Sequence, residues 1–184
     1  MLGSGATPRV VARRLFLYDP NNVFQQDPER GFEILDEVRA QFKVPFSSIR
    51  VAGSAQLGFS CYQNRDFIPQ ESDLDIAIIS QSLFQSYSEF VYGVTKRYSD
   101  LTGFGRTVGQ SNAQQFRSNL GNGYFRPDLM PNCKQKDDWF RFFNQLGTKH
   151  TDWFKSINAG IYLSEAFFEM KNSSIVDDLG KASK

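Results

Sequence analysis

The clearest structural signals in this chain are IRVAGS at residues 49–54 and SDLDIAII at residues 72–79. Each contains a run rich in β-branched residues that is bounded by polar or small residues, which is typical of a strand. Because side chains alternate across a strand, Asp73 and Asp75 should share one face of the second strand. The sequence therefore predicts two strands, of which the second carries two carboxylates side by side.

Two carboxylates on one face of a half-buried strand repel each other, which costs free energy unless a positive charge compensates it. Mg²⁺ would do so, because it takes carboxylate oxygens and is often held by one or two of them plus substrate phosphates. Gly53 and Ser54 offer a backbone that a phosphate can approach closely. The alternative, two solvated aspartates on a surface strand, fits poorly with the apolar run at residues 76–79 that follows them.

Gly53-Ser54 followed by Ser72-Asp73-Leu74-Asp75-Ile76 resembles the signature of the DNA polymerase β-type nucleotidyltransferase superfamily. In that family a Gly-Ser turn after the first core strand faces an Asp-x-Asp on the second. The stretch GSAQLG at 53–58, with SDLD at 72–75, is most similar to the small prokaryotic, minimal members, although the interval between the motifs is longer here. The resemblance implies an α/β nucleotidyltransferase fold, with a short mixed β-sheet and helices packed mainly on one face.

The resemblance also implies an activity, the transfer of a nucleoside monophosphate from a nucleoside triphosphate to an acceptor hydroxyl. Mg²⁺ or Mn²⁺ is the implied cofactor, and the acceptor can be a protein, an RNA or another nucleotide. The site residues that the resemblance implies are Asp73 and Asp75 for catalysis and metal binding, and Gly53, Ser54, Ser72 and Asn158 for nucleotide binding.

A third strand is predicted over residues 155–162, with the small polar residues Ser156, Asn158 and Gly160 on one face. Such a face lines a cleft or is the solvated face of an edge strand. Catalytically complete members of the resembled family carry a third carboxylate on such a strand, where it helps to hold a second metal and accepts the proton of the attacking hydroxyl. The best-placed residue here is Asn158, which is neutral and offers no general base.

The neutral Asn158 leads to a second functional hypothesis, a nucleotidyltransferase-like module that binds a nucleotide or a partner protein with little or no turnover. Asp128, Asp152 and Glu165 are the other acidic residues that could supply a third carboxylate, and no spacing argument selects among them.

Capping residues predict the helices. Asp27-Pro28 begins a helix over residues 28–42 whose apolar stripe is expected to include Phe32, Leu35, Val38 and Phe42. Further helices are expected after Ser80 or Ser82, after Asp137-Asp138 and after Ser164. Residues 9–18 are compatible with a helix or a strand, residues 100–136 are expected to be an irregular insertion, and the chain from Asn172 onward is expected to be loosely held.

Composition limits the remaining possibilities. The 184 residues fit a single domain over 1–184, and the net charge of +1 gives no long-range attraction to nucleic acid or anionic membranes. No apolar run approaches the ~20 residues of a membrane span. Cys61 and Cys133 have no metal-binding spacing, and the single histidine, His150, disfavours zinc chemistry. The expectation is a cytoplasmic protein without membrane association.

Overall fold

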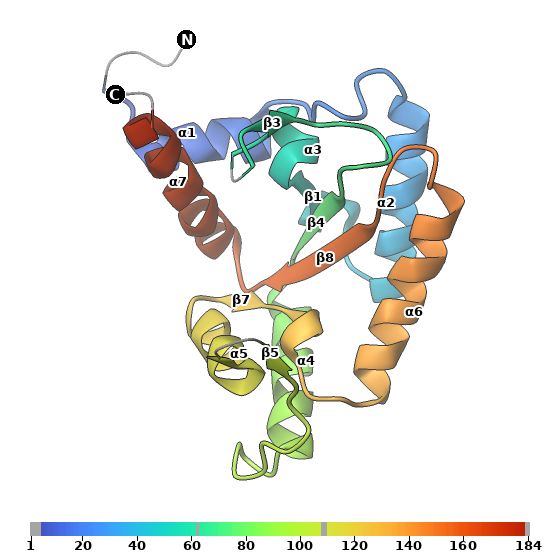
Figure 1. The fold of residues 1–184 in the computed structure, drawn as a ribbon, viewed down its shortest axis with the longest axis vertical. Helices are drawn as coiled ribbons and strands as arrows, with labels where there is room; N and C mark the ends of the chain where they lie inside the picture. The colour runs from blue at the N-terminus through green and yellow to red at the C-terminus, as the bar shows by residue number, and fades with distance from the viewer. Residues whose placement is uncertain (1–4, 62, 108–109, 183–184) are drawn as a thin grey trace.

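A four-stranded mixed β-sheet forms the centre of the computed structural model, which describes residues 5–61, 63–107 and 110–182 (Figure 1). The strand order is β1 (Ile49–Ala52), β4 (Leu74–Ile79), β8 (Ile157–Tyr162) and β7 (Tyr124–Phe125). Strand β4 runs antiparallel to β1 and parallel to β8. The three strands predicted from the sequence therefore lie side by side in one sheet, and the α/β class is confirmed.

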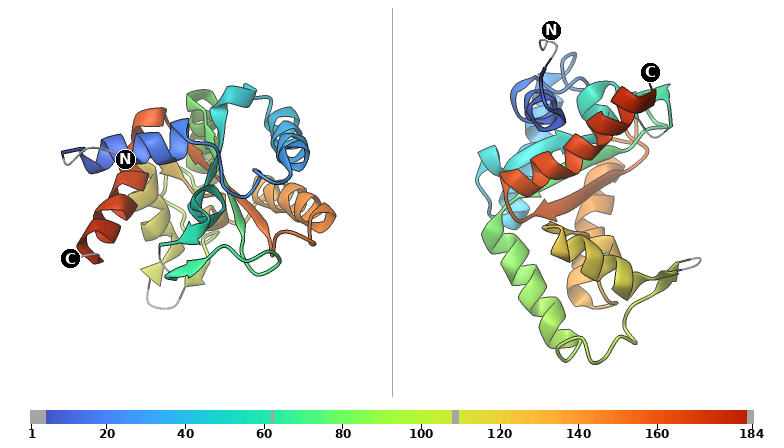
Figure 2. Two further views of the ribbon diagram at one scale, coloured as in Figure 1. Left: turned by 90° about the horizontal axis from the view of Figure 1, so that it is seen from above. Right: turned by 90° about the vertical axis from the view of Figure 1, so that its left-hand side faces the viewer.

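Side chains alternate along the strands, and hydrophobic residues pack on both faces of the sheet. Ile76 and Ile78 of β4 and Ile157 of β8 belong to the main core, where they meet helices α2 (Pro28–Phe42), α4 (Gln81–Val94), α5 (Asn112–Gly121) and α6 (Lys134–Lys149). A smaller core on the opposite face joins Ala77 and Tyr162 to Phe16 and Phe168. These two aromatic residues come from η1 (Arg14–Tyr18), a π-helical turn, and from α7 (Glu165–Ala182). Helices therefore cover both faces, and more of them lie on the first (Figure 2).

Helix α2 begins and ends as its sequence predicts, but its buried stripe is rotated. The side chain of Asp27 accepts a hydrogen bond from the Arg30 backbone amide at 3.1 Å and caps the helix. Ile34 and Val38 are fully buried, whereas Phe32, expected in the stripe, is 56% exposed and packs on Phe46. A helix has 3.6 residues per turn, so several apolar residues can form alternative stripes, and tertiary packing selects one of them.

Other helices differ more from expectation. Ser80 caps α4 as predicted, but α6 begins at Lys134, ahead of the predicted Asp137-Asp138 cap. The chain beyond Asn172, expected to be loosely held, continues as helix α7 to Ala182, and Asn172 itself is 4% exposed. Residues 9–18, which the sequence left open between helix and strand, are helical and form α1 (Pro8–Arg13) and then η1.

The segment 100–136, expected to be irregular, contains helix α5 and strand β7, and each contributes one buried phenylalanine to the core. Phe116 of α5 meets Phe125 of β7 with ring centroids 5.1 Å apart, and both are almost fully buried. The shorter elements of the chain are η2 (Phe46–Ser48), α3 (Gly53–Leu57), β2 (Phe59–Ser60), β3 (Arg65–Asp66), β5 (Arg106–Thr107), β6 (Gln110–Ser111) and η3 (Pro127–Leu129). No helix within the described residues combines the length and the apolar character needed to cross a bilayer.

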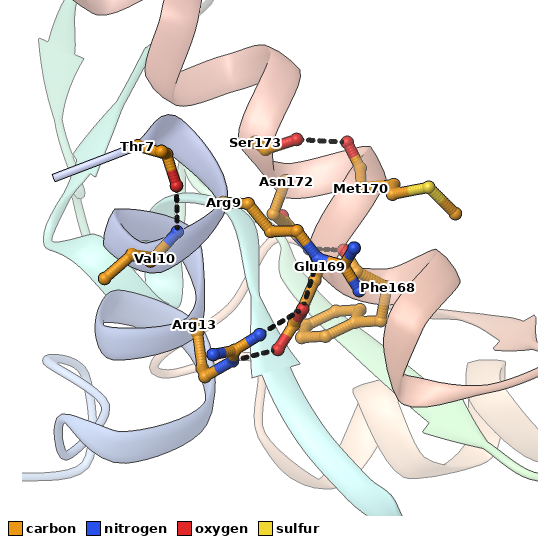
Figure 3. Close-up of polar contacts among 9 residues, drawn as sticks. All are labelled: Thr7, Arg9, Val10, Arg13, Phe168, Glu169, Met170, Asn172 and Ser173. Atoms are coloured by element: carbon orange, nitrogen blue, oxygen red, sulfur yellow. Dashed lines mark hydrogen bonds and ion pairs between the residues drawn. The ribbon is translucent and has the colours of Figure 1, made fainter.

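The first and last helices of the chain are joined through one carboxylate (Figure 3). Glu169 of α7 accepts hydrogen bonds from Arg9 at 2.7 Å and from both Nε and Nη2 of Arg13. Glu169 is 4% exposed, whereas the Arg9 and Arg13 side chains are about half exposed, at 49% and 54%. The hydrogen bond from Arg13 is the main cause that lowers the pKa of Glu169 below its usual value. Solvent reaches the arginines, so it screens part of this attraction.

Replacing Glu169 with Gln should lower the free energy of unfolding at pH 7 by roughly 1–2 kcal/mol, because a charge-assisted contact is lost beside two cations. The folded-state pKa lies below the ordinary value of 4.5, so this stabilisation is complete above that value and is lost as pH falls through the folded-state pKa. Urea unfolding of wild type and Glu169→Gln should therefore give different stabilities at pH 7 and converging ones in acid.

The control is Asp177→Asn, which removes one charge from an exposed position of the same helix. A stability difference between wild type and Glu169→Gln that stayed constant down to pH 3 would contradict the role of the ion pair.

Candidate functional site

Three residues that are paired across strands β1, β4 and β8 form a row at the end of the sheet where β1 ends and β4 and β8 begin. Ala52 of β1 is paired with Asp75 of β4, and Asp75 is paired with Asn158 of β8. Gly53 follows Ala52 directly, and Asp73 lies two residues before Asp75. The structure thus brings Gly53, both aspartates and Asn158 to one place, although Gly53 and Asn158 are 105 positions apart in the chain.

Gly53 adopts a backbone conformation that this close approach requires. Its φ is +61°, and a Cβ atom built there would lie 2.6 Å from Oδ2 of Asp75. A side chain at this position would therefore push the carboxylate away, besides straining the backbone. Ser54 is the next residue of α3 and lines the same side of the site as Asp73.

Ser156 links the first carboxylate to Asn158, a role that the sequence analysis missed. Its hydroxyl donates to Oδ1 of Asp73 at 2.7 Å and accepts from Nδ2 of Asn158 at 2.9 Å. The alternation of β8 placed Ser156 and Asn158 on the polar face, but it could not reveal a bond to a residue 83 positions away. With one amide hydrogen used by Ser156, Asn158 can direct its carbonyl oxygen elsewhere.

Ser72 holds the turn that precedes β4. Its side chain is buried, and its Oγ accepts from the Ile68 amide at 3.0 Å, while its carbonyl accepts from the Lys155 amide at 3.0 Å. The hydroxyl therefore has a partner within the turn and fixes the position of Asp73. Its direct contact with a nucleotide stays a prediction.

Asp75 is electrostatically unusual for an aspartate. Its side chain is open to solvent, but it lies deep enough in the site for surrounding protein atoms to disfavour its charged form. Desolvation by these atoms, together with the charge of Asp73, raises the pKa of Asp75 from 3.8 to about 6. The two carboxylates thus repel each other, as the sequence predicts, and a cation between them would relieve that repulsion.

Two cavities meet at Gly53 and Asp75. The first has a volume of about 250 Å³, and Ser54, Asp73 and Lys155 line it. The second has a volume of about 460 Å³, and Asn158 and Tyr124 line it. Residues from α3 and the β2–β3 hairpin form a wall of the first cavity, so the long interval between the two sequence motifs encloses one side of the site.

Each cavity also holds one lysine that forms no ion pair within the described residues, Lys155 in the first and Lys171 in the second. The arginines that line the cavities are paired. Arg65 lies 3.6 Å from Glu71 in the first cavity, and Arg126 lies 2.5 Å from Asp128 in the second.

The other acidic candidates do not complete the aspartate pair. Asp128 is bound by Arg126 on the wall of the second cavity, Asp152 forms an ion pair with Arg30 at 2.7 Å, and Glu165 is exposed in the first turn of α7. Over the described part of the chain, no group of three or more His, Cys, Asp or Glu side chains could hold a metal ion. Two carboxylates fit a single divalent cation whose remaining ligands are oxygens of a substrate and water.

Gln56 is a second residue whose role the sequence did not indicate. It is 5% exposed, and its Nε2 donates to the carbonyl oxygens of Leu15 at 2.7 Å and Asp19 at 3.2 Å. These bonds attach α3, the helix that begins at Gly53, to η1. A glutamine in a short helix is too common a signal to be read without its partners.

Comparisons of the chain with protein-family models, with curated proteins and with solved structures found no match.

Replacing Gly53 with Ala should destabilise the fold by roughly 1–3 kcal/mol, because the new Cβ would meet the Asp75 carboxylate in a backbone conformation that disfavours side chains. The matched control is Gly93→Ala in helix α4, where a Cβ would meet nothing within 4 Å. That substitution should stabilise the protein by up to about 1 kcal/mol. Urea unfolding measures both effects, and equal stabilities of Gly53→Ala and wild type would contradict the close approach of Asp75.

Proposed function

We propose that this chain is a nucleotidyltransferase-like protein. In this proposal it binds a nucleoside triphosphate with one divalent cation at Asp73 and Asp75, and it transfers the nucleoside monophosphate to an acceptor hydroxyl. The observation that carries the proposal is the row of paired residues Ala52, Asp75 and Asn158, with Gly53 directly against the Asp75 carboxylate. The sequence supplies the motifs and their spacing, and the structure adds that the motif residues lie close together in space.

Each part of the site has a role in this proposal. Gly53, Ser54 and Lys155 line the first cavity, where they would bind the β- and γ-phosphates. A bound Mg²⁺ would stabilise the negative charge that develops on the phosphates. The acceptor oxygen forms a bond to the α-phosphorus, the bond from the α-phosphorus to the bridging oxygen breaks, pyrophosphate leaves, and the hydroxyl proton is released.

Asn158 supports a second candidate function, nucleotide binding with little turnover. It occupies the position beside Asp75 and carries no charge, so neither a second metal nor the hydroxyl proton finds a carboxylate there. General-base assistance is typically worth about 10²–10⁴-fold in rate, so its absence would be a large defect.

Mg²⁺ or Mn²⁺ together with a nucleoside triphosphate should raise the melting temperature, because a ligand that binds only the native state stabilises it by mass action, by about 2.7 kcal/mol at one hundred times Kd. The double variant Asp73→Asn with Asp75→Asn should lose most of this gain, since it lacks both carboxylates. Thermal unfolding with and without ligand, for each triphosphate, measures the effect.

Asp137→Asn with Asp177→Asn makes the same change of charge at two exposed positions and should keep the full ligand effect. If the Asp73 and Asp75 double variant responded to metal and nucleotide as the wild type does, the proposed site would be wrong.

Asn158→Asp should create or increase transfer activity with little change in nucleotide affinity, because it places a third carboxylate beside Asp75. Asn158→Ala serves as the control, since it also removes the hydrogen bond to Ser156 but adds no charge. The measurement is pyrophosphate release at equal nucleotide occupancy. Rapid turnover by the wild type would favour the first candidate function and would mean that Asn158 does not limit catalysis.

A further inference from the structure

We infer that the second cavity is the acceptor site, and that the acceptor it fits is a free nucleoside monophosphate. This inference rests on the proposed function for the direction of transfer. It names the acceptor, which the sequence leaves open between protein, RNA and nucleotide.

The order of the strands supports the second cavity as the acceptor site. Strand β4 lies between β1 and β8, so Asp75 lies between the Gly53 side of the site and Asn158. In phosphoryl transfer the attacking and leaving oxygens lie roughly in line with the phosphorus. If pyrophosphate leaves toward Gly53 and Ser54 in the first cavity, the hydroxyl must attack from the opposite side. That side is the second cavity, which Asn158 lines and Ser54 does not.

The size of this cavity favours a small molecule. Its volume of about 460 Å³ lies in the range of about 300–1,000 Å³ that is usual for small-ligand pockets. Strand β7 pairs with β8 only at Ile161 and Tyr162, so the cavity extends along the remaining edge of β8. Helices α6 and α7 supply further walls.

The lining has the chemistry of a nucleotide site. Tyr124 and Phe140 offer aromatic surfaces for a planar base, and Phe140 is 36% exposed although it lies in a helix with a buried face. Asn144 lines the same cavity, and its exposed amide can bind the polar edge of a base. Asn172 also lines the cavity, but it is 4% exposed and its Nδ2 donates to the Phe168 carbonyl at 2.8 Å, so it shapes the wall.

The charged side chains of the second cavity indicate where the phosphate and the ribose hydroxyl of the monophosphate would lie. Asp128 neutralises Arg126, so Lys171 is the cation that can bind a phosphate there. Lys171 also lines a small neighbouring cavity with Asn119 and Asn122, which Asp75 and Asn158 do not line. The phosphate would therefore bind near α5 and α7, and a ribose hydroxyl would face Asn158. The carbonyl oxygen of Asn158 can accept a hydrogen bond from that hydroxyl.

The reaction then joins two nucleotides. The ribose oxygen of the monophosphate bonds to the α-phosphorus of the triphosphate, pyrophosphate leaves, and the hydroxyl proton passes to water. The product is a dinucleotide with a new phosphodiester bond and one terminal phosphate.

Binding of adenosine 5′-monophosphate without metal or triphosphate tests the inference, by calorimetry on the full chain. Lys171→Met should raise the Kd of the monophosphate about tenfold, because one charge-assisted contact to the phosphate is lost. Lys134→Met, at a lysine that lines neither cavity, should leave it unchanged. Ribose 5-phosphate should bind about tenfold more weakly than the nucleotide, because it lacks the base.

The failures of this inference and of the proposed function are distinguishable. Inorganic tripolyphosphate with Mg²⁺ probes the first cavity, and its binding should depend on Lys155 and not on Lys171. Competition between tripolyphosphate and the monophosphate, or no effect of Lys171→Met, would overturn the inference and leave the proposed function standing.

A short RNA with a free 3′-hydroxyl that bound through Lys171 more tightly than the monophosphate would also overturn the inference, in favour of an RNA acceptor. Production of the dinucleotide by Asn158→Asp, detected by mass spectrometry, is the expected result.

Discussion

The close contact between the Asp75 carboxylate and the Gly53 backbone is the constraint on which the site depends. It exists because β1 and β4 pair in a register that sets Ala52 opposite Asp75, and because Gly53 has no Cβ to occupy the space. A slip of one residue in this register would turn both aspartates toward the apolar core, at a high cost in desolvation. The burial of Ile76 and Ile78 therefore fixes the face of the sheet on which the carboxylates lie.

Electrostatics and hydrogen bonding then act on the two aspartates differently. The Ser156 hydroxyl holds Asp73, whereas desolvation by the surrounding protein and the charge of Asp73 raise the pKa of Asp75. One carboxylate is thus held by a neighbour and the other remains poorly compensated, so a cation would stabilise mainly the second. Because Ser156 also binds Asn158, the three strands contribute to one connected polar group, which alternation along any single strand cannot reveal.

The sequence predicted what depends on local periodicity and missed what depends on distant partners. Capping by Asp27 and Ser80, and the alternation in β4 and β8, follow from rules that act over a few residues. The order of segment 100–136 could not be read, because Phe116 and Phe125 are stabilised by each other and by the sheet and not by a regular local pattern. The buried stripe of α2 and the extent of α7 were missed for the same physical reason, since tertiary contacts select among locally equivalent alternatives.

Helix α7 connects the stability of the fold to the shape of the site. Its Glu169 is bound by Arg9 and Arg13 of α1, at the opposite end of the described chain. Two residues later Lys171 reaches the second cavity, and Ile175 lines both cavities, about one helical turn further on. Because α7 is one continuous helix, its attachment at Glu169 helps to hold these side chains at the cavities. The walls of the two cavities therefore depend on segments from both ends of the described chain, although Asp73 and Asp75 lie near its middle.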